Sequence, residues 1–265
     1  MSTVTASEES VLLVHRQDGI ATVTLNRPQQ YNALSQQLLL ALRDTLDQLK
    51  DDPTVRVVIL AGNGKAFCTG HDLKELRAKP DSAFHRELFS LCSEVMLRIV
   101  RLPQPVIAQV NGIATAAGCQ LVASCDLAVA ADDARFATSG INLGFFCGTP
   151  GVALSRNLAR KHALEMLFTG RFLDAQEAQA KGLVNQVVPA ARLAEATREL
   201  AAVIAAKLPA AIQAGKRLFY EQLEAGLDRA YALATELMVC NLADPDTEEG
   251  IDAFLEKRPP RWQPR

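Results

Sequence analysis

The sequence predicts an α/β fold that continues into a helical C-terminal region, and three observations support this. Short apolar strand patterns alternate with turns and helical patterns as far as about Pro189, which is typical of α/β architecture. The run Val57–Leu60 is apolar at every position, as in a strand whose sheet is buried on both faces. From Ala190 to Phe254 the pattern is almost entirely helical. We therefore expect a core over residues 1–195 and a helical region over residues 196–265, whose helices pack either on the core or on a neighbouring subunit.

The N-terminal part predicts a β-hairpin and then an amphipathic helix. The apolar runs Val11–His15 and Ile20–Leu25 flank the turn pair Asp18-Gly19, a sequence typical of a hairpin. Ser35 is a good N-cap for a helix that ends near Lys50. Five leucines are spaced to form one apolar face of that helix: Leu38, Leu39, Leu42, Leu46 and Leu49.

The alternation continues through the middle of the chain. Ser82–Val100 has the periodicity of a second amphipathic helix, and proline interrupts the C-terminal helical pattern at Pro209 and Pro245. The remaining expected elements are a strand at Pro105–Val110, a short helix at Ala116–Ala123 and a strand at Asp126–Ala130.

Composition excludes several classes of protein. The 265 residues carry a formal net charge of −2 and are 49% hydrophobic and 22% charged, as in ordinary globular proteins. A near-neutral charge argues against nucleic acid as a partner, and no apolar run reaches the ~18 residues of a membrane helix. The N-terminal MSTVTASEES has no pattern of a signal or transit peptide. We expect a cytoplasmic protein without a nucleic-acid or membrane partner.

Cysteine and histidine spacing indicates neither disulfides nor a metal site. The six cysteines form no C-x-x-C pair, and without an export signal buried free thiols are expected. The four histidines are scattered and lack the spacing of metal ligands. The cysteines are Cys68, Cys92, Cys119, Cys125, Cys147 and Cys240, and the histidines are His15, His71, His85 and His162.

Two glycine-rich loops are the candidate functional segments. The first loop, Gly62–Leu76, follows a predicted strand, and its glycines let the backbone approach a ligand closely. Within it, Asp72 and Glu75 have the spacing of a capping box for a helix that begins near Leu73. The second loop, Asn111–Leu121, also leads from a strand into a helix. Neither loop has the glycine spacing of a phosphate-binding or dinucleotide-binding motif.

Two loops of this kind, side by side, can aim backbone N–H groups at one point. Such an oxyanion hole stabilises the enolate or tetrahedral oxyanion of a thioester. The helix that begins near Ala116 would add the positive end of its dipole. The alternative is that both segments are ordinary tight strand–helix turns.

Several motifs resemble the crotonase superfamily, the enoyl-CoA hydratase/isomerase family. The resemblance extends from about Val11 to Arg258 and rests on NRP with NAL, KAFCTGHDLKEL, PVIAQVNGIATAAGCQLVASCDLAVA, FTG and A-x-GLVNQVVP. More narrowly, GHDLKEL, NGIATAAGCQLVASCDLAVA and CGTPGVAL are similar to the branch of the mitochondrial enoyl-CoA hydratase domain-containing protein 3 and its bacterial relatives.

The resemblance implies a fold, an assembly and a ligand. The fold would be a spiral of ββα units whose C-terminal helices build a homotrimer or a dimer of trimers. The ligand would be an acyl-CoA of fatty-acid metabolism, with no further cofactor and no metal. Lys257, Arg258 and Trp262 would reach the nucleotide pocket of a neighbouring subunit.

By motif position, the resemblance also implies site residues. The backbone N–H groups of His71 and Ala117 would form the oxyanion hole. The residues that would bind the acyl-CoA are Arg27, Gln30, Ala33, Lys65, His71, Asp72, Leu73, Lys74, Ala116, Ser139, Asn142 and Gly148.

The chain departs from the family pattern at both hydratase carboxylates. Gln120 and Gly140 stand where the family's lyases carry glutamates, and Ser139 stands where a proline is usual. Glutamine exchanges no proton usefully near neutral pH, and each general acid or base contributes about 10²–10⁴ in rate. Efficient hydration is therefore not expected. No acidic residue lies between Ser139 and Gly151, which also argues against a dienoyl isomerase.

Other side chains leave alternatives open. The His71 imidazole is a base if it turns inward, or else only its backbone matters. Cys119 is a nucleophile near a helix start, or else a small buried thiol. Thr138, Ser139 and Asn142 are candidates for positioning water or the acyl group. Two functions remain: a CoA-thioester enzyme with non-hydratase or weak hydratase chemistry, and a catalytically degenerate acyl-CoA-binding or regulatory protein.

Overall fold

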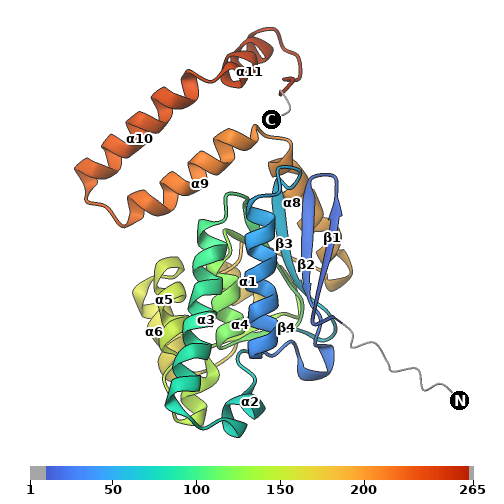
Figure 1. The fold of residues 1–265 in the computed structure, drawn as a ribbon, viewed down its shortest axis with the longest axis vertical. Coiled ribbons are helices and arrows are strands. Elements are labelled where there is room, and N and C mark those ends of the chain that lie inside the picture. The colour runs from blue at the N-terminus through green and yellow to red at the C-terminus, as the bar shows by residue number, and fades with distance from the viewer. Residues whose placement is uncertain (1–9, 263–265) are drawn as a thin grey trace, which may run out of the picture.

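The computed structural model describes residues 10–262 and has an α/β core from which a helical arm extends (Figure 1). The larger sheet has the strand order β1-β2-β3-β5-β7-β10, and the smaller has the order β4-β6-β8-β9. Apart from the antiparallel pairs β1–β2 and β8–β9, neighbouring strands are parallel. The predicted α/β class is thus confirmed. Residues 1–9, on which the expectation about targeting signals rests, lie outside the described residues.

The strands of the larger sheet are β1 (Leu12–Gln17), β2 (Ile20–Leu25), β3 (Val57–Gly62), β5 (Val106–Val110), β7 (Leu127–Ala131) and β10 (Gln186–Val188). Those of the smaller sheet are β4 (Ala66–Cys68), β6 (Ile113–Thr115), β8 (Arg135–Ala137) and β9 (Leu173–Asp174).

The core helices are α1 (Gln36–Lys50), α2 (Leu73–Ala78), α3 (Ser82–Arg101), α4 (Ala117–Ser124), α5 (Gly148–Asn157), α6 (Arg160–Thr169), α7 (Ala175–Ala180) and α8 (Leu193–Ala205). The arm consists of α9 (Pro209–Leu223), α10 (Leu227–Leu242) and α11 (Pro245–Leu255). The 3₁₀ turns are η1 (Pro28–Gln30), η2 (Ser139–Leu143) and η3 (Ala190–Arg192). The predicted hairpin, helices and strands are all present, with ends shifted by one or two residues.

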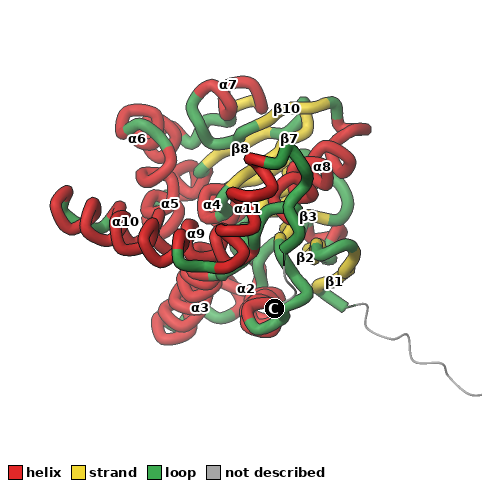
Figure 2. The backbone as a smooth tube through the Cα atoms, turned by 90° about the horizontal axis from the view of Figure 1, so that it is seen from above, coloured by secondary structure: helices red, strands yellow, loops and turns green. Residues whose placement is uncertain are grey.

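Strand β3 explains why the sheet has two apolar faces. Val58 and Leu60 pack into the larger core with α1 and α3, whereas Val57 and Ile59 pack on the other face beneath α8. Because strand side chains alternate between faces, an unbroken apolar run is what a sheet covered on both sides requires. Figure 2 shows the strands between α8 and the helices α4 and α5.

The chain repeats a strand–strand–helix unit. In each repeat the first strand (β3, β5 or β7) joins the larger sheet, and the second (β4, β6 or β8) joins the smaller one. Because β4 pairs with β6 in parallel, with Cys68 opposite Ala114, the segments that leave these two strands emerge side by side. This arrangement brings the two glycine-rich loops to one place.

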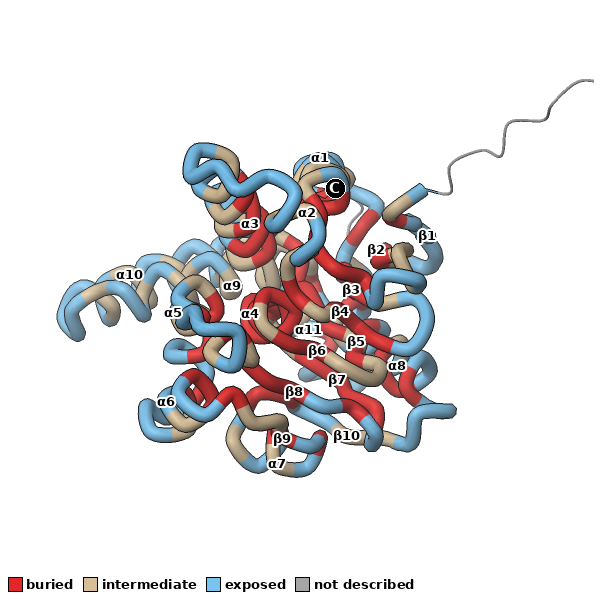
Figure 3. The backbone as a smooth tube through the Cα atoms, turned by 90° about the horizontal axis from the view of Figure 1, so that it is seen from below, coloured by how far each residue is buried: buried red, intermediate tan, exposed pale blue. Residues whose placement is uncertain are grey.

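The arm is exposed or half-buried at nearly every position in the single chain (Figure 3). Neither α9 nor α10 has a buried residue, and the predicted boundary at 195/196 falls inside α8, which covers the sheet. No helix in residues 10–262 is long and apolar enough to cross a membrane. The exposed large apolar side chains of the arm are Phe219, Leu223, Leu227, Tyr231, Met238, Val239, Leu242, Ile251, Phe254 and Leu255.

Candidate functional site

The two glycine-rich loops touch each other at Gly70. Gly70 has φ +88°, and a methyl group on its Cα would lie 2.8 Å from Ala116 Cβ and 3.2 Å from Ala117 N. A side chain at this position would separate the loops, and the positive φ would strain it. The absence of a side chain at Gly70 therefore lets the first turn of α4 approach the segment around His71.

Each loop presents a backbone N–H group that has no acceptor. Leu34 donates to the Gly70 carbonyl (2.8 Å) and accepts from the Asp72 N–H (3.1 Å), so the His71 N–H in this bridge points to the opposite side. Ala117 is the first residue of α4, where backbone N–H groups lack partners within the helix. Neither the His71 N–H nor the Ala117 N–H donates to any group in residues 10–262.

Ala116, which precedes this helix, has an unusual backbone conformation. Its φ is +51° and its ψ −120°, a region that costs a non-glycine residue about 1–3 kcal/mol and is found mostly at functional sites. Its N–H donates to the Ala137 carbonyl at 2.9 Å. The sharp turn at Ala116 directs the N-terminus of α4, and the Ala117 N–H, toward the first loop.

Neutral side chains surround these N–H groups. Gln120, in the first turn of α4, is 4% exposed, and its Oε1 accepts no hydrogen bond. The hydroxyl groups of Thr115 and Ser139 lie 2.9 Å apart, and the buried Thr138 hydroxyl has no partner within the described chain. Such groups can orient a ligand by hydrogen bonding, but none is a carboxylate that takes up a proton near neutral pH.

Gly140 has no room for a side chain. A Cβ built on this residue would lie 2.7 Å from Cys147 Sγ, 2.9 Å from Phe145 Cε2 and 3.1 Å from the Phe145 carbonyl oxygen. Phe145 is tied to Gly140 by a backbone hydrogen bond of 3.2 Å. The direction in which a carboxylate side chain would leave residue 140 is thus filled by an aromatic ring and a thiol.

The His71 imidazole is packed away from water. Its ring meets Phe89 of α3 edge-on at 5.0 Å, and neither ring nitrogen has a hydrogen-bond partner. Burial lowers the pKa of His71 to about 4. A group with this pKa is a weak proton acceptor at neutral pH, which argues against the imidazole as a catalytic base.

This burial predicts a loss of stability in acid. Between about pH 6.5 and pH 4 the unfolded chain protonates His71 while the folded chain does not, so folding stability falls as the pH falls through this range. The expected loss is roughly 2–3 kcal/mol. Urea unfolding at several pH values would measure it, with His71→Phe as the comparison. If the free energy of unfolding of His71→Phe changed with pH in this range as steeply as that of the unaltered protein, the prediction would be wrong.

The predicted CoA-binding residues fall into two groups. Arg27 is held within the chain, because it forms an ion pair with Asp72 at 3.0 Å and donates to the Ala33 carbonyl. The side chains of Gln30, Lys65 and Lys74 are exposed and form no ion pair within the described residues. The first group fixes the loop, and the second has side chains available for a ligand. The other predicted positions are half-buried or exposed: Leu73, Ala116, Ser139, Asn142 and Gly148.

The predicted capping box at Asp72 is only half formed. Asp72 accepts from the N–H groups of Lys74 and Glu75, as expected, and α2 begins at Leu73. The carboxylate of Glu75 instead accepts from the Gln36 N–H at 2.9 Å. The reason is that the Asp72 N–H, which a capping box would use, already donates to Leu34.

The buried thiols are poor nucleophiles. Burial raises the pKa of Cys119 to about 12, with a smaller contribution from Cys147. Burial likewise raises the pKa of Cys68 and of Cys92 to about 12. Because the thiolate is the reactive form, these values favour Cys119 as a packed small residue. Cys240 is exposed, and all six cysteines are free.

The C-terminal residues expected to reach a neighbour are largely engaged in their own chain. Arg258 pairs with Glu249 and Glu256, each at 2.6 Å. The Trp262 indole N–H donates to the Ala206 carbonyl at 3.0 Å. The Lys257 side chain forms neither an ion pair nor a hydrogen bond among the described residues.

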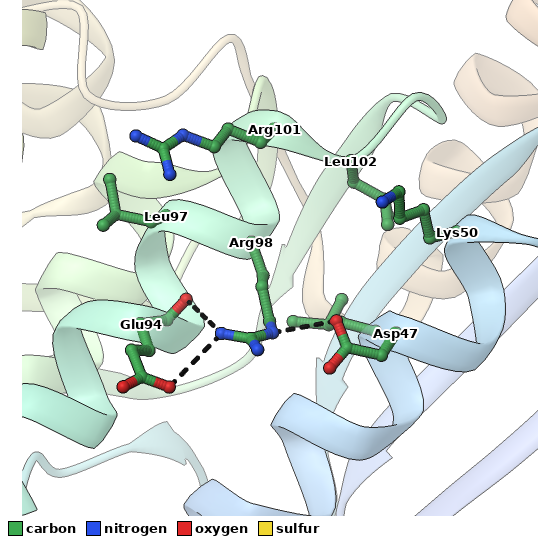
Figure 4. A pocket seen from close by; sticks show the side chains of 8 residues that line it. Asp47, Lys50, Glu94, Leu97, Arg98, Arg101 and Leu102 are labelled. Atoms are coloured by element: carbon green, nitrogen blue, oxygen red, sulfur yellow. Dashed lines mark hydrogen bonds and ion pairs between the residues drawn. The ribbon is translucent and has the colours of Figure 1, made fainter.

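A groove of about 310 Å³ lies away from this site, between α1 and α3 (Figure 4). In it Arg98 binds Asp47 at 2.8 Å and Glu94 at 3.4 Å. These opposite charges largely satisfy one another, and exposed pairs of this kind contribute little energy. The groove has no unpaired backbone donors like those at the two loops.

Three site residues were not predicted from the sequence: Thr115, Phe89 and Phe145. Phe89 is an ordinary apolar position of an amphipathic helix, and Phe145 lies in a loop without a motif. Their proximity to His71 and Gly140 depends on the packing of segments distant in the chain. The signal in the sequence is Gly140 itself, because a glycine whose backbone does not require positive φ can mark a close approach of another segment.

Comparison with known proteins supports one family. The enoyl-CoA hydratase/isomerase family matches residues 15–265. The mitochondrial enoyl-CoA hydratase domain-containing protein 3 from Homo sapiens is 50% identical over 245 residues, covering 92% of this chain and 81% of the relative. The 2,3-dehydroadipyl-CoA hydratase from Escherichia coli is 36% identical over 257 residues, covering 97% of this chain and all of the relative.

Solved structures agree on the fold. An enoyl-CoA hydratase from Mycobacterium smegmatis superimposes with a TM-score of 0.94 at 56% identity, covering 96% of this chain and 99% of that one. Human enoyl-CoA hydratase domain-containing protein 3 gives 0.92 at 48% identity, covering 95% of this chain and 100% of that one. The expected crotonase fold is thus confirmed, and the chain belongs to the enoyl-CoA hydratase/isomerase family.

Proposed function

We propose that the protein binds an acyl-CoA and holds the thioester carbonyl oxygen with the N–H groups of His71 and Ala117. The observation that carries this proposal is that both N–H groups lack an acceptor although their loops are in contact. Two backbone donors aimed at one oxygen stabilise the negative charge that develops on a thioester. The N-terminus of α4 adds a favourable partial charge at the same point.

The proposed chemistry is not efficient hydration. Gln120 offers no exchangeable proton near neutral pH, and the backbone at Gly140 is covered by Phe145 and Cys147. The donors alone can support reactions that need only oxyanion stabilisation. These are slow thioester hydrolysis, decarboxylation of a malonyl-type CoA, or weak hydration through bound water. We therefore do not expect the family's lyase activity to be the main reaction of this chain.

A pair of ligands tests the proposed role of the carbonyl oxygen. Butyryl-CoA and its thioether analogue S-butyl-CoA differ only in that oxygen. We expect calorimetry to show butyryl-CoA binding about tenfold more tightly, because two hydrogen bonds of roughly 0.5–1.5 kcal/mol each are lost with the thioether. Equal affinities would mean that the N–H pair does not bind the carbonyl.

The same purified protein separates the two roles, enzyme and binding protein. It would be incubated with enoyl-, saturated and malonyl-type CoA thioesters, and the products analysed by mass spectrometry against a heat-inactivated control. A gain of water, a loss of the acyl group or a loss of carbon dioxide identifies a reaction. Retention of an unchanged thioester through gel filtration supports the binding role. Rapid hydration of crotonyl-CoA would contradict the proposal.

We also propose a homotrimer, or a dimer of trimers, built through the arm. The support is the row of exposed apolar side chains on α9–α11, which includes Phe219, Leu227 and Tyr231. Apolar surfaces of this extent mark protein contacts in most soluble proteins. Sedimentation velocity gives the assembly mass, and a monomer at micromolar concentration would refute this part. The cytoplasmic location stays an expectation.

A further inference from the structure

The short segment Gly144–Cys147 folds back onto the site through Gly140. The Phe145 N–H donates to the Gly140 carbonyl at 3.2 Å, and the Gly148 N–H donates to the Phe146 carbonyl at 2.8 Å. Cys147 is 3% exposed and precedes α5. These contacts hold the inner edge of the Phe145 ring and the Cys147 sulfur against Gly140, within 2.9 Å of where its Cβ would be.

This apolar contact adjoins the strand end that packs against the turn at Ala116 and Ala117. The Ser139 hydroxyl is 2.9 Å from the Thr115 hydroxyl, and the Ala116 N–H donates to the Ala137 carbonyl at 2.9 Å. Residues 137–140 thus run next to the turn that presents the Ala117 N–H. The β-carbon of a thioester is only two bonds from the carbonyl carbon, so a carbonyl held at this turn places its β-carbon near Gly140.

We propose that Phe145 and Cys147 form an apolar wall at Gly140 that selects acyl-CoA ligands with a hydrocarbon β-carbon and disfavours ligands with a 3-hydroxyl group. The inference rests on the proposed function and adds the residues that set its specificity. An aromatic edge accepts no ordinary hydrogen bond, and a thiol is only a weak donor and acceptor. A hydroxyl buried against this wall loses its hydrogen bonds to water without an equal replacement.

The neutral polar groups on the other side of the turn do not replace the wall. The Thr115 and Ser139 hydroxyls already bond each other. The buried polar atoms without a partner that could meet a 3-hydroxyl group are the Thr138 hydroxyl and Gln120 Oε1. Gln120 Oε1 lies on α4, whereas the wall residues Phe145 and Cys147 lie in the segment between η2 and α5. A hydroxyl of one configuration would therefore face the wall, and a hydroxyl of the other would face away from it. The test accordingly uses both enantiomers.

The experiment compares calorimetric affinities for butyryl-CoA, free CoA, and (3S)- and (3R)-3-hydroxybutyryl-CoA. We expect butyryl-CoA to bind about 10- to 100-fold more tightly than the enantiomer whose hydroxyl faces the wall, the range over which an apolar pocket rejects an added hydroxyl. The other enantiomer should be rejected less strongly. Cys147→Ser places a hydroxyl in the wall. It should lower the ratio of the affinity for butyryl-CoA to the affinity for the hydroxy ligand several-fold, as should Phe145→Ala. Phe168→Ala is the matched control, since Phe168 is 63% exposed and contacts Phe146 instead of Gly140.

The possible outcomes are distinct. An unchanged ratio in Phe168→Ala, with a narrowed ratio in the two wall variants, supports the wall. If both hydroxy ligands bind the unaltered protein as tightly as butyryl-CoA, the proposal is overturned. It is also overturned if both folded wall variants leave the affinity ratio unchanged. If butyryl-CoA binds no better than free CoA, the proposed function fails as well. Circular dichroism and urea unfolding establish that each variant is folded.

Discussion

Replacing Gly118 with alanine is expected to destabilise the protein by about 3 kcal/mol, the upper end of the usual cost of overpacking. The new methyl group would lie 2.0 Å from the Cys68 carbonyl oxygen and 2.6 Å from the Cys68 carbonyl carbon. Both are backbone atoms of β4, so no side-chain rotation relieves the contact. Either α4 or β4 must move.

The same substitution should also weaken acyl-CoA binding. Strand β4 leads to the loop with the His71 N–H, and α4 begins with the Ala117 N–H. Moving β4 away from α4 separates these two donors, and misplacement of catalytic groups by about 1 Å costs on the order of 100-fold in rate. Butyryl-CoA affinity, measured by calorimetry in the folded variant, checks this consequence.

Gly215→Ala is the control for Gly118→Ala. Gly215 lies within α9 and a methyl group there would meet nothing within 4 Å, so the variant should gain roughly 0.5–1 kcal/mol from better helix propensity. Urea unfolding measures whether each substitution raises or lowers the free energy of unfolding. A stabilised or neutral Gly118→Ala would contradict the close approach of α4 to β4.

Replacing Lys216 with methionine is expected to cost about 3–5 kcal/mol, the range for breaking a buried ion pair. The Lys216 ammonium binds Asp126 Oδ2 at 2.7 Å and the carbonyls of Ile99 and Gln104 at 3.0 Å each. Asp126 also accepts from the Tyr220 hydroxyl at 2.9 Å. The variant leaves a largely buried carboxylate without its counter-charge and releases α9 from the core.

The exposed pair between Arg156 and Glu224 provides the control. It also joins the core to the arm, at 3.2 Å, but its side chains are 58% and 68% exposed. Arg156→Met should therefore cost less than about 1 kcal/mol. Urea unfolding compares the two variants, and hydrogen exchange reports whether α9–α11 loosen before the core. If both variants lowered the free energy of unfolding equally, Lys216 would not be the main contact that holds the arm to the core.

The network at Lys216 relates stability to assembly. Few contacts hold the arm to its own core, because α9 and α10 have no buried residues. Lys216 and Tyr220 both converge on Asp126, at the start of β7, and thereby set the direction in which α9 leaves the core. If the arm builds the proposed trimer, Lys216→Met should also lower the assembly mass.

Local sequence pattern was enough to predict part of the core. The leucine spacing before Lys50 and the Asp18-Gly19 turn depend on neighbours within a few residues, and the structure confirms the helix and hairpin they predict. The residue types at positions 120 and 140 alone were also sufficient to show that neither Gln120 nor Gly140 supplies a carboxylate for proton transfer. A residue type sets the available protonation chemistry whatever the fold.

Tertiary structure decided what surrounds those positions. Only the register of β4 on β6 brings Gly70 against Ala117, and only the fold-back of Gly144–Cys147 fills the space at Gly140. The same holds for Gly118. Helix propensity alone predicts that alanine would stabilise the protein there, whereas the contact with β4 predicts that alanine destabilises it. These contacts join residues far apart in the sequence or depend on loop conformation, and local sequence pattern specifies neither. The sequence determined which chemical groups are present, and the packing of strands and helices determined which of them are buried, unpaired and adjacent.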